Sequence, residues 1–295
     1  MTSRRILSLS IYLVVFICLP GLAQKPGIDP SLLQKANAGD VKAQLALGEA
    51  YASGISVAQD YSRAASWLQK AADQGSAQAQ FDMGALYEAG NGVQQDDARA
   101  ASWYQKAAEQ GFAPAELHLG LLYDHGNGVT QDSAQAAGWY RKAALQKIPE
   151  AEYNLGTLYE RGIGVPQDYA QAADLYRLAA EQGNASAQFN LGLLYDNGTG
   201  LEKNYTQAAA WYSKAAEQGL PRAQFNLGTM YANGQGVPVN LVESYFWLEL
   251  AAKTWSGSRQ DDAVHARDLV AQHLNPTDLA AAQDRAAKWL AAHQR

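Results

Sequence analysis

Histidine is the first side chain to consider for metal chemistry, and the chain contains few. The five histidines are His118, His125, His265, His273 and His293. His118 and His125 lie seven residues apart in a segment with helical periodicity, so they share a face but are separated by about 10 Å along the helix axis. Because both ligands of one ion must lie within about 2 Å of it, the sequence predicts no metal site and no metal cofactor.

Closely spaced glycines in loops are the next candidates, because such loops can cradle a phosphate group. Five G-x-G sequences occur, of which Gly126-Asn127-Gly128 is typical. Each follows a helical pattern rather than a strand, and none has the third glycine of the dinucleotide-binding fingerprint. We therefore interpret these loops as turns that end helices, and we predict no nucleotide cofactor.

The sequence motifs of three hydrolase classes are absent. H-E-x-x-H, G-x-S-x-G and S-x-x-K, which are typical of zinc hydrolases, serine hydrolases and penicillin-recognising enzymes, do not occur. A catalytic site would have to be assembled from several parts of the chain without a known motif. The sequence therefore predicts a protein that is not an enzyme.

A 36-residue repeat organises most of the chain. A glycine and, three residues later, a tyrosine recur at this interval in six consecutive units over residues 39–254. The repeat glycines are Gly48, Gly84, Gly120, Gly156, Gly192 and Gly228. A period of this length is typical of helical repeat arrays.

Each unit has the pattern of two short helices, as the second unit shows. Ala79, Met83 and Tyr87 are spaced four apart and fall on one helical face; we name this first helix of a unit helix A. The loop at residues 90–92 ends it, because glycine adopts the left-handed conformation without steric cost. Asp96 is then the expected N-cap of a second helix, helix B.

Neither helix can bury its apolar face within one unit, so neighbouring units must stack. Paired alanines such as Ala107 and Ala108 allow close approach, and the repeat glycine removes a side chain where two helices would collide. The sequence therefore predicts an all-α fold. The expected form is a right-handed superhelical solenoid of six 36-residue helix-turn-helix repeats with N- and C-terminal capping helices.

These motifs resemble a known repeat family. The pattern A-x-A-Q-x-x-L-G-x-x-Y, followed by G-x-G-V and then by D, A and W-x-x-x-A-A, runs around residues 79–108 and is similar to the Sel1-like repeat, a relative of the tetratricopeptide repeat. The resemblance implies a protein-interaction scaffold, and many bacterial members are exported. A disulfide-rich secreted subgroup, some of whose members have been linked to β-lactam binding or hydrolysis, pairs cysteines between helices. Here Cys18 is the only cysteine.

The N-terminus has the features of a secretory signal. Arg4 and Arg5 precede an apolar stretch at residues 6–19, and Ala23 ends a segment of small residues. The stretch is shorter than the roughly 20 residues that span a membrane. We predict a signal peptide at residues 1–23, a periplasmic or secreted location, and no membrane span after cleavage; a retained anchor is the alternative.

The remaining boundaries follow from the repeat. Residues 24–38 are predicted to form an N-terminal capping helix that starts at Asp29-Pro30, and residues 39–254 the six repeats. After residue 254 the period is no longer recognisable, and residues 255–295 are predicted to form C-terminal capping helices divided at Asn275-Pro276.

The charge of the chain excludes one class of partner. The formal net charge is −6, and removal of residues 1–23, which hold two arginines and no acid, makes it −8. An acidic chain without a basic run has no electrostatic attraction to phosphate backbones. No nucleic-acid partner is predicted.

The resemblance to tetratricopeptide repeats implies that helix A lines a concave wall. The positions three before, one after and four after the repeat glycine would face it, which gives a row of bulky apolar side chains beside a row of acids. The candidate groove residues are Phe81, Glu88, Leu117, Leu121, Asp124, Tyr153, Glu160, Phe189, Leu193, Asp196 and Phe225. Such a wall would suit a protein or peptide partner with basic and apolar residues.

Other interpretations remain open at this stage. The acids can be solvated helix ends, and the aromatic residues can fill gaps between helices. A cell-envelope hydrolase acting on β-lactams or wall peptides is an alternative function. A protein that binds peptidoglycan or another glycan through its tryptophans is a second alternative, although their place in the repeat favours packing in the core.

Overall fold

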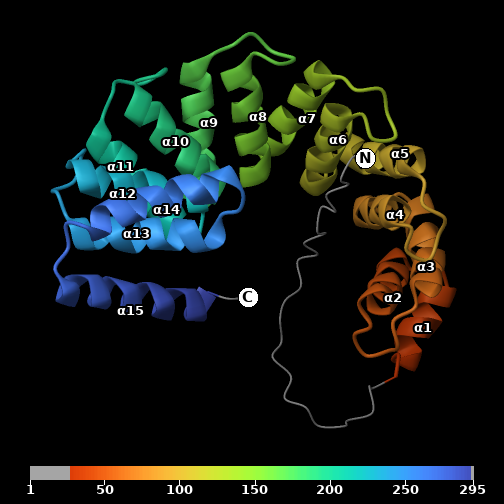
Figure 1. Ribbon diagram of the computed structural model, residues 1–295. Helices are drawn as coiled ribbons and strands as arrows, with labels where there is room; N and C mark the ends of the chain where they lie inside the picture. Colours follow the sequence, from red (N-terminus) through yellow and green to blue (C-terminus); the bar gives the residue numbers. More distant parts are fainter. Residues whose placement is uncertain (1–26, 294–295) are drawn as a thin grey trace.

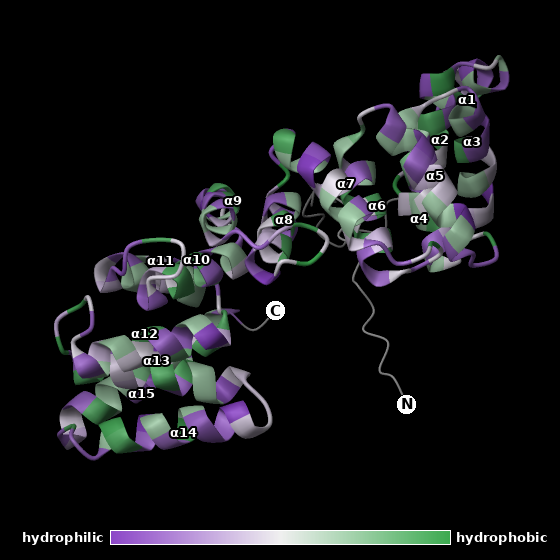
Figure 2. Ribbon diagram, turned by 90° about the horizontal axis from the view of Figure 1, so that it is seen from above, coloured by the Kyte–Doolittle hydropathy of each residue, from purple (hydrophilic) through white to green (hydrophobic). Residues whose placement is uncertain are grey.

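The computed structural model describes residues 27–293, which fold into fifteen α-helices and no strand. The predicted signal peptide lies outside the described residues. The helices form an arc of antiparallel pairs (Figure 1), and successive pairs advance from one corner of the view to the opposite corner when the arc is seen from above (Figure 2). The predicted all-α solenoid of six helix pairs is confirmed. Within the described residues, no helix is both long and apolar enough to cross a membrane.

Helices A and B alternate through the six units. Helix A is α2 (Val41–Ser53), α4 (Ala77–Ala89), α6 (Ala113–His125), α8 (Pro149–Arg161), α10 (Ala185–Asn197) and α12 (Pro221–Asn233). Helix B is α3 (Tyr61–Asp73), α5 (Asp97–Glu109), α7 (Ser133–Leu145), α9 (Tyr169–Glu181), α11 (Tyr205–Glu217) and α13 (Leu241–Thr254). In the first limb of the arc, α2 and α4 lie on the inner side and α3 on the outer side (Figure 1).

Local signals set the helix ends. The Asp96 carboxylate accepts a hydrogen bond from the backbone N–H of Arg99 at 2.9 Å, which confirms it as the N-cap of helix B. Asn204 caps α11 in the same way at 3.0 Å. Helix A of the second unit ends at Gly90 with a φ of 70°, a left-handed conformation that favours glycine.

The repeat glycine lies where helix A crosses helix B. A Cβ built on Gly84 would lie 2.7 Å from Cδ1 of Tyr104, and one on Gly120 would lie 2.6 Å from Cδ1 of Tyr140. These tyrosine rings are fully buried. The predicted role of the glycine is therefore confirmed: it leaves the space that a ring of helix B occupies.

In four of the six units a buried glutamine joins helix A to the helix before it, whereas the third and fourth units have Glu116 and Glu152 at this position. The Gln80 side chain donates to the Ala72 carbonyl of the preceding helix B at 3.1 Å, and its own oxygen accepts from Gln110 at 2.7 Å. One side chain thus satisfies a backbone carbonyl and ties three helices together. Such buried polar groups are costly unless they are fully hydrogen-bonded.

The same bond shows that the two ends continue the array. Helix α1 (Pro30–Asn37) precedes the first unit, and Gln44 donates to its Ala36 carbonyl at 3.1 Å. Helix α14 (Ser258–Ala271) follows the last unit, and its Gln260 donates to the Ala252 carbonyl at 3.1 Å. Each end therefore holds half a repeat, and α14 keeps the 36-residue register that its sequence conceals.

Helix α15 (Pro276–His293) turns back onto the last full unit. It packs on α13. Arg285 of α15 forms an ion pair with Glu243 of α13 and places its guanidinium 3.8 Å from the Phe246 ring centroid. Because α15 covers α13 rather than following α14, the solenoid ends there.

The second loop glycine makes the tightest contact between units. A Cβ on Gly128 would lie 2.1 Å from the carbonyl oxygen of Asp97, at the start of the preceding helix B, and the φ of Gly128 is 69°. In the first unit Ser56 takes this place with a φ of 66°. Among the described residues, α1 begins at Pro30, five residues later in the repeat register than helix B of the other units, so no described helix start crowds Ser56 and a side chain is accepted there.

We predict that Gly128→Ala destabilises the protein by about 2 kcal/mol or more, because a side chain adds left-handed strain and meets the backbone of the neighbouring unit. Thermal unfolding followed by circular dichroism measures this as a lower Tm. Ser56→Ala is the matched control and should change stability by less than about 0.5 kcal/mol. Equal effects of the two substitutions would contradict the proposed contact.

Candidate functional site: the inner wall

The predicted apolar row packs against helix B of its own unit. Ring centroids lie 5.4 Å apart for Phe81 and Tyr104, 5.8 Å for Tyr153 and Tyr176, and 5.6 Å for Phe189 and Tyr212. Phe189 is buried, whereas Phe81 and Tyr153 are half-buried. The rings are therefore held at fixed places while part of the row remains accessible.

The aliphatic members and the last aromatic member of the row are half-buried as well. Leu117 and Leu121 pack on the core around Tyr140, and Leu193 packs on the core around Tyr212. Phe225 has no tyrosine partner and instead lies 5.6 Å, between ring centroids, from Trp255. Each unit thus builds its own apolar cluster, and the last cluster differs from the others.

The predicted acids pair with the buried tyrosines. The hydroxyl of Tyr104 donates to Glu88 at 2.7 Å. That of Tyr176 donates to Glu160, and that of Tyr212 donates to Asp196 at 3.2 Å. Asp124 is half-buried in the same register, but the Tyr140 hydroxyl has no hydrogen-bond partner among residues 27–293.

Residue types in the six units follow the same pairing. In the four units whose helix B carries the buried tyrosine, an acid stands four residues after the repeat glycine. In the first and sixth units Leu68 and Leu248 replace the tyrosine, and Ala52 and Ala232 replace the acid. An acid is thus present where a buried hydroxyl needs an acceptor. Burial raises the tyrosine pKa values above their ordinary range, so each hydroxyl remains a donor. Three of these acids are therefore structural partners of the buried tyrosines.

A second row of inner-wall residues was not identified from the sequence. It stands two before the repeat glycine and consists of Asp82, His118, Asn154, Asn190 and Asn226, all half-buried. Asn190 and Asn226 lie close to the hydroxyls of the tyrosines of the preceding units, Tyr176 and Tyr212, and act to lower their pKa values against the effect of burial. Three asparagines at the 36-residue interval were the available signal, and two of them approach the tyrosine of the unit before.

His118 takes the same place in the third unit and closes an aromatic cluster. Its ring centroid lies 5.2 Å from those of Phe81 and Tyr104, and its Nδ1 lies 4.0 Å from a Glu88 oxygen. Burial lowers the pKa of His118, and the nearby Glu88 carboxylate opposes this change. Within the described chain, no three His, Cys, Asp or Glu side chains are grouped to hold a metal ion.

Asp82 is the exception in this row. One of its carboxylate oxygens, Oδ2, is buried without a hydrogen-bond partner in the described part of the chain, while Oδ1 accepts from Gln78 at 2.9 Å. The preceding unit carries Leu68 where the others offer a tyrosine hydroxyl. Burial raises the pKa of Asp82 to about 7; the Gln78 hydrogen bond opposes the rise and the charge of Glu49 adds to it.

Lysines cover four of the five tryptophans of helix B, and the fifth, Trp247, is buried. Trp211 is buried and Trp103 is half-buried. A lysine ammonium lies over each of the four covered rings, 4.0 Å from the centroid for Trp67, 3.8 Å for Trp103, 3.7 Å for Trp139 and 4.0 Å for Trp211. The lysine positions occupy the ring faces on which a sugar would stack.

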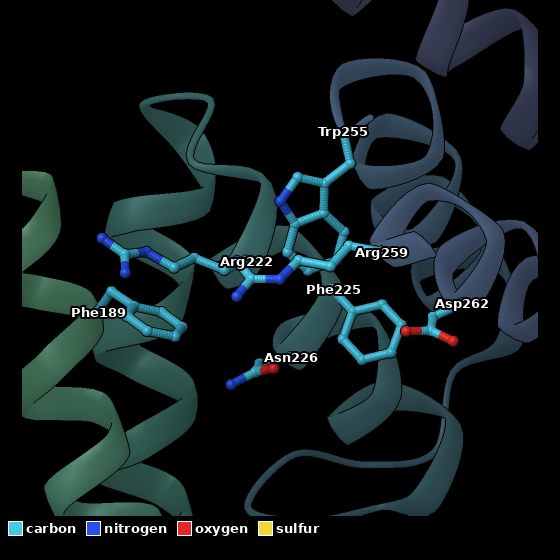
Figure 3. A pocket seen from close by; sticks show the side chains of 7 residues that line it. All are labelled: Phe189, Arg222, Phe225, Asn226, Trp255, Arg259 and Asp262. Carbon is cyan, nitrogen blue, oxygen red and sulfur yellow. The ribbon is translucent and has the colours of Figure 1, made fainter. Parts of the chain in front are cut away.

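A pocket of about 370 Å³ lies at the C-terminal end of the inner wall. Figure 3 shows its lining, in which α10 contributes Phe189, α12 contributes Arg222, Phe225 and Asn226, and the α13–α14 segment contributes Trp255, Arg259 and Asp262. The sequence identified only Phe189 and Phe225 of these. The register of α14 was concealed, and Arg222 and Asn226 of α12 lie outside the three helix A positions that were expected to face the groove.

We predict that Asp82→Asn raises the Tm at pH 8 by several degrees, where about 2–4 °C corresponds to 1 kcal/mol, and raises it by less at pH 5. A carboxyl whose pKa is raised from 3.8 to about 7 on folding contributes stability that is fully present only below the lower value and is lost progressively as the pH rises to the higher one. Asn154→Asp is the converse control and should lower the Tm more at pH 8 than at pH 5. Tm differences that are the same at both pH values would contradict this assignment.

We also predict that Tyr176→Phe lowers stability by about 1.5 kcal/mol, since it removes a hydrogen bond to a carboxylate. Tyr140→Phe should be neutral or stabilising, because its hydroxyl has no acceptor among the residues of the structure. Urea unfolding midpoints of the two variants provide the comparison. The opposite order of stabilities would disprove the role given to the acid row.

The repeat seen in the sequence and in the fold matches a known family. The family model of the Sel1 repeat matches residues 41–76, 77–112, 113–147, 149–184, 185–220 and 221–253. No curated protein matches the chain. Sel1 repeat proteins are typically non-catalytic scaffolds that bind other proteins.

Solved structures of Sel1 repeat proteins are also similar. A Sel1 repeat protein from Oxalobacter formigenes is 33% identical, with 78% of this chain and 89% of that chain covered and a TM-score of 0.65. A protective antigen of uropathogenic Escherichia coli is 29% identical, with 88% and 70% covered and a TM-score of 0.40. The helix pairs, the position-by-position repeat and the six family matches agree, and the chain belongs to the Sel1 repeat family.

Proposed function

We propose that the protein is an exported scaffold that binds a protein or peptide partner along its inner wall. The observation that carries this proposal is the pairing of an inner-wall ring with a buried tyrosine whose hydroxyl donates to an acid, which occurs in the second, fourth and fifth units. Because the tyrosine is locked by packing and hydrogen bonding, the neighbouring ring and carboxylate are held in place before a partner arrives. Such preorganisation reduces the entropy cost of binding.

The chemistry of the wall indicates the chemistry of the partner. The Glu88 side chain remains 33% exposed although one oxygen accepts from Tyr104, so its charge still faces the groove. Half-buried Phe81, Leu117 and Tyr153 lie beside this row of acids. An extended or helical segment with basic and apolar residues at regular spacing would match both rows.

Export is part of the proposal and rests on the N-terminal sequence. Arg4, Arg5, the apolar residues 6–19 and the small residues before Gln24 support a signal that is removed after Ala23. N-terminal sequencing of the protein recovered from the periplasm or the medium tests it. A chain that retains Met1 would show that this segment is not cleaved.

We predict that replacing the four acids by their amides, Glu88→Gln, Asp124→Asn, Glu160→Gln and Asp196→Asn, weakens partner binding about tenfold or more. Amides are preferable to charge reversal, because an amide oxygen still accepts from the tyrosine hydroxyl and the fold is retained. Quantitative pull-downs from envelope extract with wild type and variant, together with their Tm values, give the measurement.

A matched control neutralises four acids outside the groove. Asp73→Asn, Glu109→Gln, Glu181→Gln and Glu217→Gln change exposed residues near the C-termini of B helices and should leave binding intact. Recovery of the same proteins in the same amounts by wild type and the groove variant would disprove the proposed groove. So would an equal loss in the control.

A further inference from the structure

We propose that the pocket between α10, α12 and α14 binds a peptide carboxylate together with the apolar or aromatic side chain next to it. This inference rests on the proposed function, since it specifies how one end of a bound peptide is held. The pocket volume of about 370 Å³ is suited to one residue and its carboxylate rather than to a whole domain.

The first observation is the pair of arginines. Arg222 lies over the Phe189 ring, 4.6 Å from its centroid, and Arg259 lies over the Trp255 ring at 5.9 Å. No carboxylate within residues 27–293 forms an ion pair with either guanidinium. Their N–H groups therefore remain available for a carboxylate, which a guanidinium can bind through two parallel hydrogen bonds.

The contacts of Arg222 leave this capacity largely unused. One of its nitrogens, Nη2, approaches the Ser186 hydroxyl at 3.5 Å, a long and weak contact. Figure 3 shows the Arg259 side chain extending across the pocket from α14 between Arg222 and Phe225. Both charges thus serve one pocket, although they come from different helices.

The second observation is the charge of the pocket compared with the rest of the wall. The chain has a net charge of −6, and the inner wall of the middle units carries four acids. Here two arginines face a single acid, Asp262, which leaves one net positive charge. A singly charged carboxylate matches this balance better than a doubly charged phosphate, which Asp262 would repel.

The third observation is the apolar lining. Phe225 and Trp255 lie 5.6 Å apart, between ring centroids, and Phe189 completes a three-ring wall. Asn226 adds an amide that can bond to a peptide group. Rings beside guanidinium groups would accept an apolar side chain and its adjacent carboxylate together, as in a terminal phenylalanine or a glutamate followed by phenylalanine.

The position of the pocket gives the bound peptide a direction. The pocket lies where the inner wall meets α14, after the last acid of the row, Asp196. A peptide with basic and apolar residues along the middle units would therefore place its carboxylate at the C-terminal end of the array. The carboxylate can be the peptide C-terminus or an acidic side chain, and one experiment separates the two.

The test uses three synthetic hexapeptides of lysine and leucine that end in phenylalanine. The first has a free C-terminal carboxylate, the second is amidated, and the third is amidated with glutamate in the penultimate place. Isothermal titration calorimetry with the purified protein should give an affinity about tenfold or more higher for one carboxylate peptide than for the amide. Tight binding of only the first or only the third identifies the source of the carboxylate.

Variants then assign the binding to the pocket. Arg222→Met with Arg259→Met should bring all three peptides to the affinity of the amide, while Arg222→Lys with Arg259→Lys should retain an intermediate preference. The control Arg63→Met with Arg99→Met removes two exposed arginines that pair with Asp60 and Asp96 at helix B starts and should change nothing. Equal affinities of the three peptides for wild type, or an equal loss in the control, would overturn the proposal.

The outcomes also separate this proposal from the proposed function. If the four-amide groove variant loses its partner while the arginine pair has no effect, the groove is supported and the pocket is not. If the carboxylate preference depends on the arginines but the groove variant recovers its partners normally, the pocket is supported and the groove is not.

Discussion

At each repeat glycine, helix A approaches helix B so closely that a side chain of helix B occupies the space a Cβ would need. Gly84 against Tyr104 shows the arrangement. The absent side chain fixes the crossing of the two helices, and the crossing brings the tyrosine hydroxyl to the acid one turn after the glycine, as in the bond from Tyr104 to Glu88. The packing of the ring against the glycine and the hydrogen bond to the acid therefore depend on the same helix crossing, and a displaced helix would break both contacts. The inner wall inherits its regular spacing from this contact.

The units are joined by polar contacts at two places along helix A. Near its N-terminus a buried glutamine such as Gln80 donates to a carbonyl of the preceding unit, and near its centre an asparagine such as Asn190 approaches the preceding tyrosine. Because these contacts cross between units, the units that carry them depend on a neighbour for satisfied polar groups as well as for a buried surface. A long, thin array can in this way remain rigid without a disulfide.

Much of the architecture could be predicted from the sequence because it depends on local signals. The loop glycines and the Asp96 cap act over a few residues, and the 36-residue period can be read directly from the sequence. The structure agrees with all three. The role of the acids could not be predicted, since Tyr104 and Glu88 are 16 residues apart and meet only through the helix crossing. Helix α14 has neither the repeat glycine nor the repeat tyrosine, because Val264 and Arg267 occupy these two positions. Arg259 could therefore not be placed on the inner wall.

The glutamine bond has a polarity, because the glutamine of one unit donates to a carbonyl of the unit before it, as in the second, fifth and sixth units. The first unit finds its acceptor on α1, and α14 donates to the last unit in the same way. The third and fourth units have Glu116 and Glu152 at this position, which accept from Gln146 and Gln182 instead. All five junctions between units nevertheless share one contact, in which the second loop glycine faces the start of the preceding helix B. A whole module could be gained or lost through unequal recombination between the coding repeats, and the new joint would form without any adjustment elsewhere. Lineages of such genes could lengthen or shorten the binding surface stepwise, so evolution could match it to partners of different size.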